Sequence, residues 1–206
     1  MNKYSTETLI AGSLLLFLLS ACGNQKPSAA ASDTTPKTDS TTNTKFFPIS
    51  DYLASEIRYV DTTPLAILKC ETLHDKTDSA FLTPAEFHRL ATTFLGPELD
   101  PDTLEKNYTE SSFGDKTTGY INFTYTPKDR SLALRRIDVV VAAGEGMDKV
   151  KSIYLEKIDR LSDTVMIKKM YWQARKSFLI ITSLQAPAKK PTVRQLKVVW
   201  NNEEED

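Results

Sequence analysis

The sequence contains little cysteine, glycine and histidine and no long apolar run, and each of these absences excludes a class of protein. Two cysteines in 206 residues exclude a disulfide-stapled scaffold and a four-cysteine zinc site. Seven glycines and 40% hydrophobic residues exclude collagen-like and wholly disordered chains. The formal net charge of −1 lacks the positive excess typical of nucleic-acid-binding proteins, so we expect no nucleic acid partner.

The longest apolar run lies close to the amino terminus and is short. Residues 9–21 read LIAGSLLLFLLSA, which is 13 residues without a charge. A helix that spans a bilayer needs about 20 such residues. Lys3 precedes the run, and the small residues Ser20 and Ala21 end it. This pattern predicts a secretory signal peptide over residues 1–21.

The residues at the end of this run carry a more specific signal. Leu19-Ser20-Ala21-Cys22 resembles the lipobox of bacterial lipoproteins. The resemblance implies that residues 1–21 are removed and that Cys22 carries acyl chains such as palmitate. Each buried methylene contributes about 0.8 kcal/mol, so two or three chains hold a protein on a membrane. The alternative is ordinary secretion with cleavage near Ala21.

The family's sorting rule adds a location in the cell envelope. Gly23-Asn24, rather than an aspartate, follows the cysteine. In enteric-type sorting this implies the outer membrane, with the protein facing the periplasm or the cell surface.

A polar segment separates Cys22 from the first aromatic residues. Residues 23–44 contain no aromatic and no branched aliphatic side chain, so they cannot bury enough apolar surface to fold. A flexible chain of this length has a root-mean-square span of roughly 26 Å. We therefore expect a lipidated cysteine and disordered tether over 22–45, a single folded domain over 46–200, and an acidic disordered tail over 201–206.

Two segments at the start of this domain have the spacing of amphipathic helices. Residues 48–60 repeat apolar side chains at helical spacing. Residues 83–95 open with Thr83 and Glu86, which form a capping-box pattern. The buried stripe of this second helix is predicted to consist of Phe87, Leu90, Ala91, Phe94 and Leu95.

The remaining chain is predicted to be mainly strand. Residues 65–70 suggest a short strand followed by a polar loop over 74–78, and Asp100-Pro101-Asp102 suggests one further short turn. From about residue 108 the apolar period changes to two, and a turn is expected at Gly144-Glu145-Gly146. Seven consecutive strands are predicted at 108–113, 121–125, 132–143, 150–158, 165–174, 178–184 and 193–200.

Helices followed by a run of strands predict an α+β fold. We expect the two N-terminal helices to pack on one face of a curved antiparallel meander sheet of about seven strands. In architecture this layout resembles the half-barrel with a helical lid of periplasmic lipoprotein carriers, and also cone-shaped ligand-binding α+β domains. The likeness rests on no shared motif, and a fold does not determine a function.

Few residues suggest catalysis or metal binding. Cys70 is the one thiol left once Cys22 is lipidated, and it could pair with His74 as a thiolate and imidazole. The preferred interpretation is a core cysteine, because Cys70 alternates in step with Leu68 on a strand. His74 and His88 have no zinc-site spacing, so we expect a solvated or capping His88, no metal and no cofactor.

Charge is distributed unevenly along the domain. Residues 46–129 contain 7 basic and 14 acidic residues, whereas residues 130–200 contain 15 basic and 6 acidic residues. The basic half could present a surface for an anionic lipid or an acidic envelope protein. Alternatively, its lysines and arginines only solubilise the sheet. The second interpretation is favoured, because adjacent residues such as Lys168 and Lys169 must point to opposite faces.

Aromatic residues on the predicted strands could line a ligand pocket or form the core. Tyr171 and Trp172 are adjacent and must point to opposite faces, so at least one of them is expected outside the core. The core interpretation is preferred for the others. The aromatic residues concerned are Tyr154, Tyr171, Trp172, Phe178 and Trp200.

These observations predict a membrane-anchored envelope lipoprotein that acts as a non-enzymatic binding or scaffolding module. One alternative is a carrier or sensor that holds an apolar ligand between the helices and the curved sheet. A second alternative, which the sequence favours less, is an enzyme that uses Cys70 or a histidine. The predicted partners are the membrane, through the acyl chains, and an envelope protein or anionic lipid at the basic half.

Overall fold

The computed structural model describes residues 46–143 and 149–201, which belong to one compact unit. The predicted signal peptide, Cys22 and tether lie outside the described residues, as do the turn at 144–146 and all but the first residue of the tail. Among the described helices, none has the length and apolar character required to cross a membrane.

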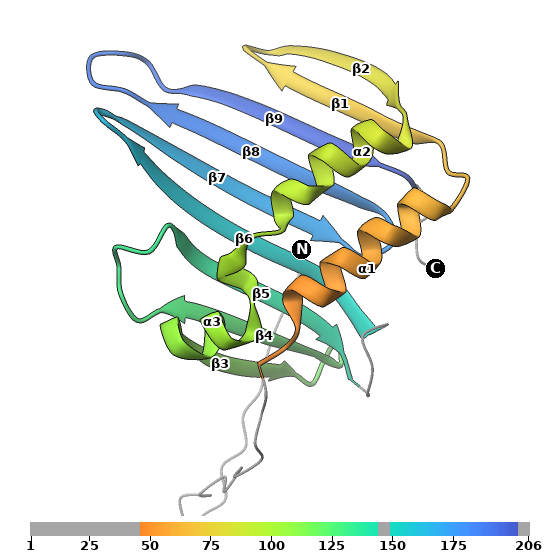
Figure 1. Cartoon of the computed structure of the whole chain (residues 1–206), viewed down its shortest axis with the longest axis vertical. Helices are drawn as coiled ribbons and strands as arrows, with labels where there is room; N and C mark the ends of the chain where they lie inside the picture. The colour runs from red at the N-terminus through yellow and green to blue at the C-terminus, as the bar shows by residue number, and fades with distance from the viewer. Residues whose placement is uncertain (1–45, 144–148, 202–206) are drawn as a thin grey trace, which may run out of the picture. The chain divides into compact units, whose positions relative to one another are not determined.

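The fold is α+β and is built on one antiparallel sheet (Figure 1), which confirms the predicted class. The sheet has nine strands in the order β2-β1-β9-β8-β7-β6-β5-β4-β3. The strands are β1 (Ile67–Leu73), β2 (Lys76–Leu82), β3 (Tyr108–Asp115), β4 (Tyr120–Pro127), β5 (Leu134–Ala142), β6 (Val150–Leu161), β7 (Thr164–Gln173), β8 (Ser177–Gln185) and β9 (Thr192–Val199).

The predicted strand number was wrong, because a hairpin extends the meander. The seven consecutive strands predicted from residue 108 onward are present as β3–β9. Strands β1 and β2 form a hairpin, and β1 pairs with β9 so that Lys69 lies opposite Val198. The meander therefore does not end at β9, and the two edges of the sheet are β2 and β3.

Strand β2 was predicted to be partly a polar loop, and its sequence explains the error. Six of its seven residues are exposed, so it shows no apolar alternation. The turn before it consists of His74 and Asp75, which have φ values of 48° and 62°. Two successive positive φ angles are typical of a tight hairpin turn, which glycine or asparagine usually signals. Charged Lys76 and Asp78 protect this edge strand against pairing with other chains.

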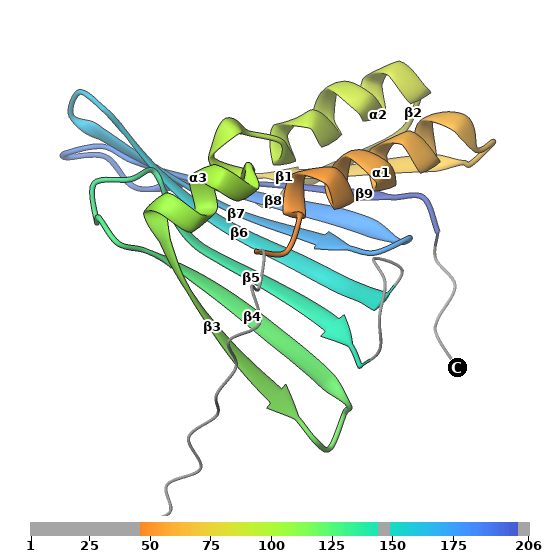
Figure 2. The ribbon, with the colours of Figure 1, turned by 60° about the horizontal axis from the view of Figure 1, so that its bottom comes forward.

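The helical layer contains three α-helices and two short 3-10 turns rather than two helices, and Figure 2 shows that they lie on the same side of the sheet. The capping box of α2 is confirmed, since the Glu86 N–H donates to Thr83 Oγ1 over 3.3 Å and the Thr83 N–H donates to Glu86 Oε2 over 2.9 Å. The expected short turn near Asp100 is a helix of seven residues. The elements are α1 (Ile49–Thr62), α2 (Pro84–Ala91), η1 (Thr92–Phe94), η2 (Pro97–Leu99) and α3 (Pro101–Asn107).

Aromatic rings join the helices to the sheet. The Phe94 ring lies 5.1 Å from the Trp172 ring and 5.3 Å from the Phe178 ring, measured between centroids. Phe87 packs edge-on against Trp200 at 5.4 Å. Ring pairs at such separations add about 0.5–1.5 kcal/mol each to the stability gained from burial. The predicted stripe is confirmed at Phe87, Ala91 and Phe94, while Leu90 and Leu95 are partly buried against the same core.

We predict that Phe94→Ala lowers the free energy of unfolding by about 3–5 kcal/mol, because it leaves a cavity beside two aromatic rings. His88→Ala should cost less than about 1 kcal/mol, since the His88 side chain is 55% exposed. Denaturant melts of the two variants measure both values. A larger cost for His88→Ala would contradict the face assigned to α2.

Candidate functional site

Cys70 does not lie in the core, which corrects the preferred prediction. On the same strand, β1, Ile67 is buried on the helix side, whereas Leu68 and Cys70 are only partly buried. The alternation with Leu68 was therefore correct, but these residues occupy the face opposite the helices. Cys70 lies opposite Lys197 on β9 and Ser79 on β2.

The structure does not bring Cys70 and a histidine together. Cys70 and His74 are four residues apart along an extended strand and its turn, which corresponds to roughly 13 Å. His88 contacts Asp61 on α1, with 2.6 Å between Nδ1 and Oδ2, so it links two helices at the surface. Among the described residues no group of three or more potential metal ligands occurs.

The face of β6–β9 opposite the helices, here called the open face, is not covered by another described element. The pairing registers put Tyr154, Tyr171 and Leu179 in one row across it. Nine of its side chains are apolar and none of them is buried, because nothing within the described residues covers this face. These residues are Tyr154, Ile158, Val165, Ile167, Tyr171, Leu179, Ile181, Val193 and Val199.

Three cations stand among these apolar residues. Arg160, Lys169 and Lys197 are all exposed and have the alternation of the open face. None of the three forms an ion pair with another residue of the described part of the chain. A basic surface of this kind attracts anions at longer range than a surface whose charges are paired internally.

The one acidic residue of the open face is already engaged. Glu156 Oε2 accepts a hydrogen bond of 2.8 Å from the Tyr154 hydroxyl. Burial, together with this contact, raises the pKa of Tyr154 to about 12, so the phenol stays protonated and continues to donate. Among the described residues, the open face therefore presents three cations and one carboxylate, which lies opposite Lys169 on β7.

The same side of the sheet is different over β3–β5. There Arg136 Nε donates to Asp138 Oδ2 over 2.6 Å, and Thr124 Oγ1 donates to Asp138 Oδ1 over 2.7 Å. Arg136 and Asp138 therefore pair with each other on this part of the sheet. On the side of the sheet away from the helices, the excess of cations thus lies on β6–β9, whereas on β3–β5 Arg136 is paired with Asp138.

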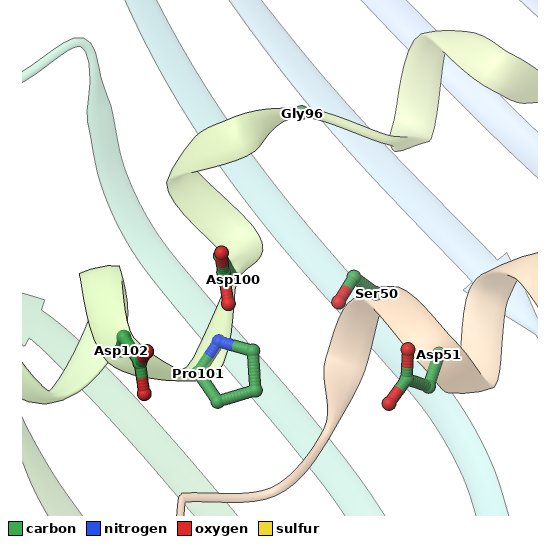
Figure 3. Close-up of a pocket in the computed structure, with 6 residues that line it drawn as sticks. All are labelled: Ser50, Asp51, Gly96, Asp100, Pro101 and Asp102. Atoms are coloured by element: carbon green, nitrogen blue, oxygen red, sulfur yellow. The ribbon is translucent and has the colours of Figure 1, made fainter.

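A hollow of about 510 Å³ lies between the starts of α1 and α3 (Figure 3). Ser50 and Asp51 line it from α1, and Pro101 and Asp102 of α3 line it together with Asp100, which precedes that helix. Carboxylates in these places interact favourably with the positive ends of the helix dipoles, which explains them without a ligand. The lining is mainly polar and does not suit an apolar ligand.

Glu56 is a buried carboxylate that sequence reasoning missed. It lies on α1 and its side chain is 2% exposed. Glu56 Oε2 accepts hydrogen bonds from the Arg175 backbone N–H at 2.8 Å and from Trp172 Nε1 at 3.4 Å. Its Oε1 pairs with Arg175 Nε at 3.1 Å. These contacts attach α1 to the turn between β7 and β8.

Arg175 reaches Glu56 from a constrained position. Its φ is 59°, and its guanidinium lies 4.0 Å from the centre of the Tyr59 ring, one helical turn beyond Glu56. A cation over an aromatic face gains about 0.5–1 kcal/mol at an exposed site. The arrangement positions α1 on the sheet.

We predict that Glu56→Gln lowers the free energy of unfolding by about 1–3 kcal/mol, because it leaves the buried partners of the carboxylate poorly paired. The matched control is Glu71→Gln at the partly exposed pair with Arg194, where we expect less than about 1 kcal/mol. Thermal or denaturant unfolding distinguishes the two. Equal costs would show that the buried contacts of Glu56 do not stabilise the fold.

Of the five aromatic residues expected on strands, Trp172, Phe178 and Trp200 are buried in the core. Tyr154 and Tyr171 lie on the open face, which corrects the core prediction for Tyr154. Trp172 is fully buried and Tyr171 is 39% exposed on the open face, which confirms that they point in opposite directions.

Compared with known proteins, the chain matches no family model, no curated protein and no solved structure.

Proposed function

We propose that this chain is a lipid-anchored protein of the bacterial cell envelope and acts as a non-enzymatic binding module. The anchor is Cys22, on the strength of the lipobox Leu19-Ser20-Ala21-Cys22. Two or three acyl chains suffice to hold a soluble domain on a bilayer. Gly23-Asn24 supports the outer membrane as its destination.

The observation that carries the binding role is the composition of the open face. Its aliphatic and tyrosine side chains are partly exposed, and Arg160, Lys169 and Lys197 stand among them without an ion pair to another described residue. Exposed apolar surface rimmed by one sign of charge is typical of an interaction site. The module therefore binds an anionic partner through the open face.

The carrier alternative receives less support. A carrier needs apolar space between the helices and the sheet. In the described residues that region is filled by the rings of Phe87, Phe94, Trp172, Phe178 and Trp200, which contact one another at centroid distances of 5.1–6.2 Å. An enzyme based on Cys70 is likewise less supported, because no histidine adjoins it.

The anchor is tested by exchanging its cysteine. In the variant, a leader that is cleaved without lipidation replaces residues 1–21, and the chain also carries Cys22→Ser. This protein should appear in the soluble fraction. Membranes are washed at about 1 M salt, where the Debye length is about 3 Å, so that contacts between exposed charges are removed. Cys70→Ser in the native chain is the control and should stay in the pellet. Recovery of the Cys22→Ser product in the washed pellet would contradict the anchor.

The binding role is tested by site-specific photocrosslinking in cells. A photoreactive phenylalanine derivative at Tyr171 should give crosslinked adducts, because this position lies in the middle of the open face. The control is Phe113 on edge strand β3, which is 71% exposed and so more accessible to chance collisions. Equal yields at the two positions would contradict binding through the open face.

A further inference from the structure

We propose that the anionic partner of the open face is the bilayer surface itself, so that the anchored domain lies with β6–β9 against lipid headgroups. This inference rests on the proposed lipid anchor and binding role. It adds the partner's chemistry and the orientation of the domain.

The side chains of the open face are those that suit a membrane–water interface. Tyr154 and Tyr171 combine an apolar ring with a polar hydroxyl, which is the chemistry enriched at headgroup level. Lysine and arginine bury their apolar stems and keep the charge near phosphate. Each such cation near an anionic surface contributes about 1 kcal/mol, or roughly five-fold in binding.

Charge disfavours a second copy of the chain as the occupant. Two open faces in contact would oppose Arg160, Lys169 and Lys197 with the same three cations. The one acidic side chain of the open face, Glu156, lies opposite Lys169 and offsets only one of the three positive charges, so each described face keeps a positive excess. Like charges brought together in this way repel, whereas an anionic bilayer complements them.

The proposed tether allows this orientation. Phe46 packs on Tyr125 with 5.4 Å between ring centroids, and Tyr125 is buried in the core on the helix side of β4. The chain must therefore pass from the helix side to the membrane side of the sheet. Residues 23–45 can extend to roughly 80 Å, several times the thickness of a sheet with its side chains. Tethering also raises the local concentration of the bilayer near the open face.

The test uses the chain from residue 22 onward with Cys22→Ser, so that no acyl chain contributes. We expect it to sediment with vesicles of phosphatidylcholine and phosphatidylglycerol at low salt, and not with phosphatidylcholine alone. Cys70, now the single thiol, lies beside Lys197 and reports on the face directly. Its alkylation by a water-soluble maleimide should slow when anionic vesicles are present.

Charge-reversal variants and a matched control show which surface of the domain binds the vesicles. Lys169→Glu with Lys197→Glu should weaken vesicle binding at least about ten-fold. Lys106→Glu with Lys116→Glu changes the net charge equally at exposed positions away from the open face and should change binding less than about two-fold. Val193→Asp, at a 51% exposed position, should also weaken binding, whereas Phe113→Asp on β3 should not.

Several outcomes would overturn the proposal. These are equal binding to neutral and anionic vesicles, equal loss in the two double variants, or unchanged alkylation of Cys70. Protection of Cys70 by soluble polyglutamate without vesicles would instead assign the open face to an acidic protein. A failed anchor appears only in the fractionation of Cys22→Ser at high salt, so the two failures are distinguishable.

Discussion

The contact between the aromatic rings of α2 and η1 and those of β7 and β8 determines the rest of the architecture. Phe94 meets Trp172 and Phe178, and all three side chains are fully buried. This contact assigns one face of the sheet to the helices. A sheet has only two faces, so the residues that point away from Trp172 along the same strand must meet solvent or a partner. The open face therefore exists because the aromatic core residues and the helices occupy only the other face of the sheet.

The hydrogen bonds and ion pair between Glu56 and Arg175 complement the contact between the aromatic rings, because they depend on direction. Rings in a core tolerate small shifts, whereas Glu56 requires both the Arg175 N–H and guanidinium at defined positions. Packing thus supplies most of the stability, and the buried carboxylate sets the register of α1 over the β7–β8 turn. Because both constraints act on the helix side, the face away from it tolerates change without loss of the fold.

Helices and strands were predicted correctly where the sequence pattern that identifies them lies within a short stretch of the chain. The helix that begins after Thr83 has a cap, an apolar stripe and a stop within about a dozen residues, and apolar and polar residues alternate in the sequence of β4 and in the burial of β5. Strand β2 was missed because an exposed edge strand has no alternation. Cys70 was assigned to the wrong face because alternation groups residues without saying which group is covered. Glu56 was missed because its partners lie 116 and 119 residues away in the chain.

The pairing of β1 with β9 has a consequence for how the protein is made. It joins Glu71 to Arg194, which are 123 residues apart, and it forms one of the internal ladders of the sheet. Such long-range contacts form slowly, because the loop between the partners must close first. The sheet cannot be completed until nearly the whole polypeptide has emerged from the ribosome. Until β9 has been synthesised, the β1–β2 hairpin lacks the strand that joins it to the rest of the sheet.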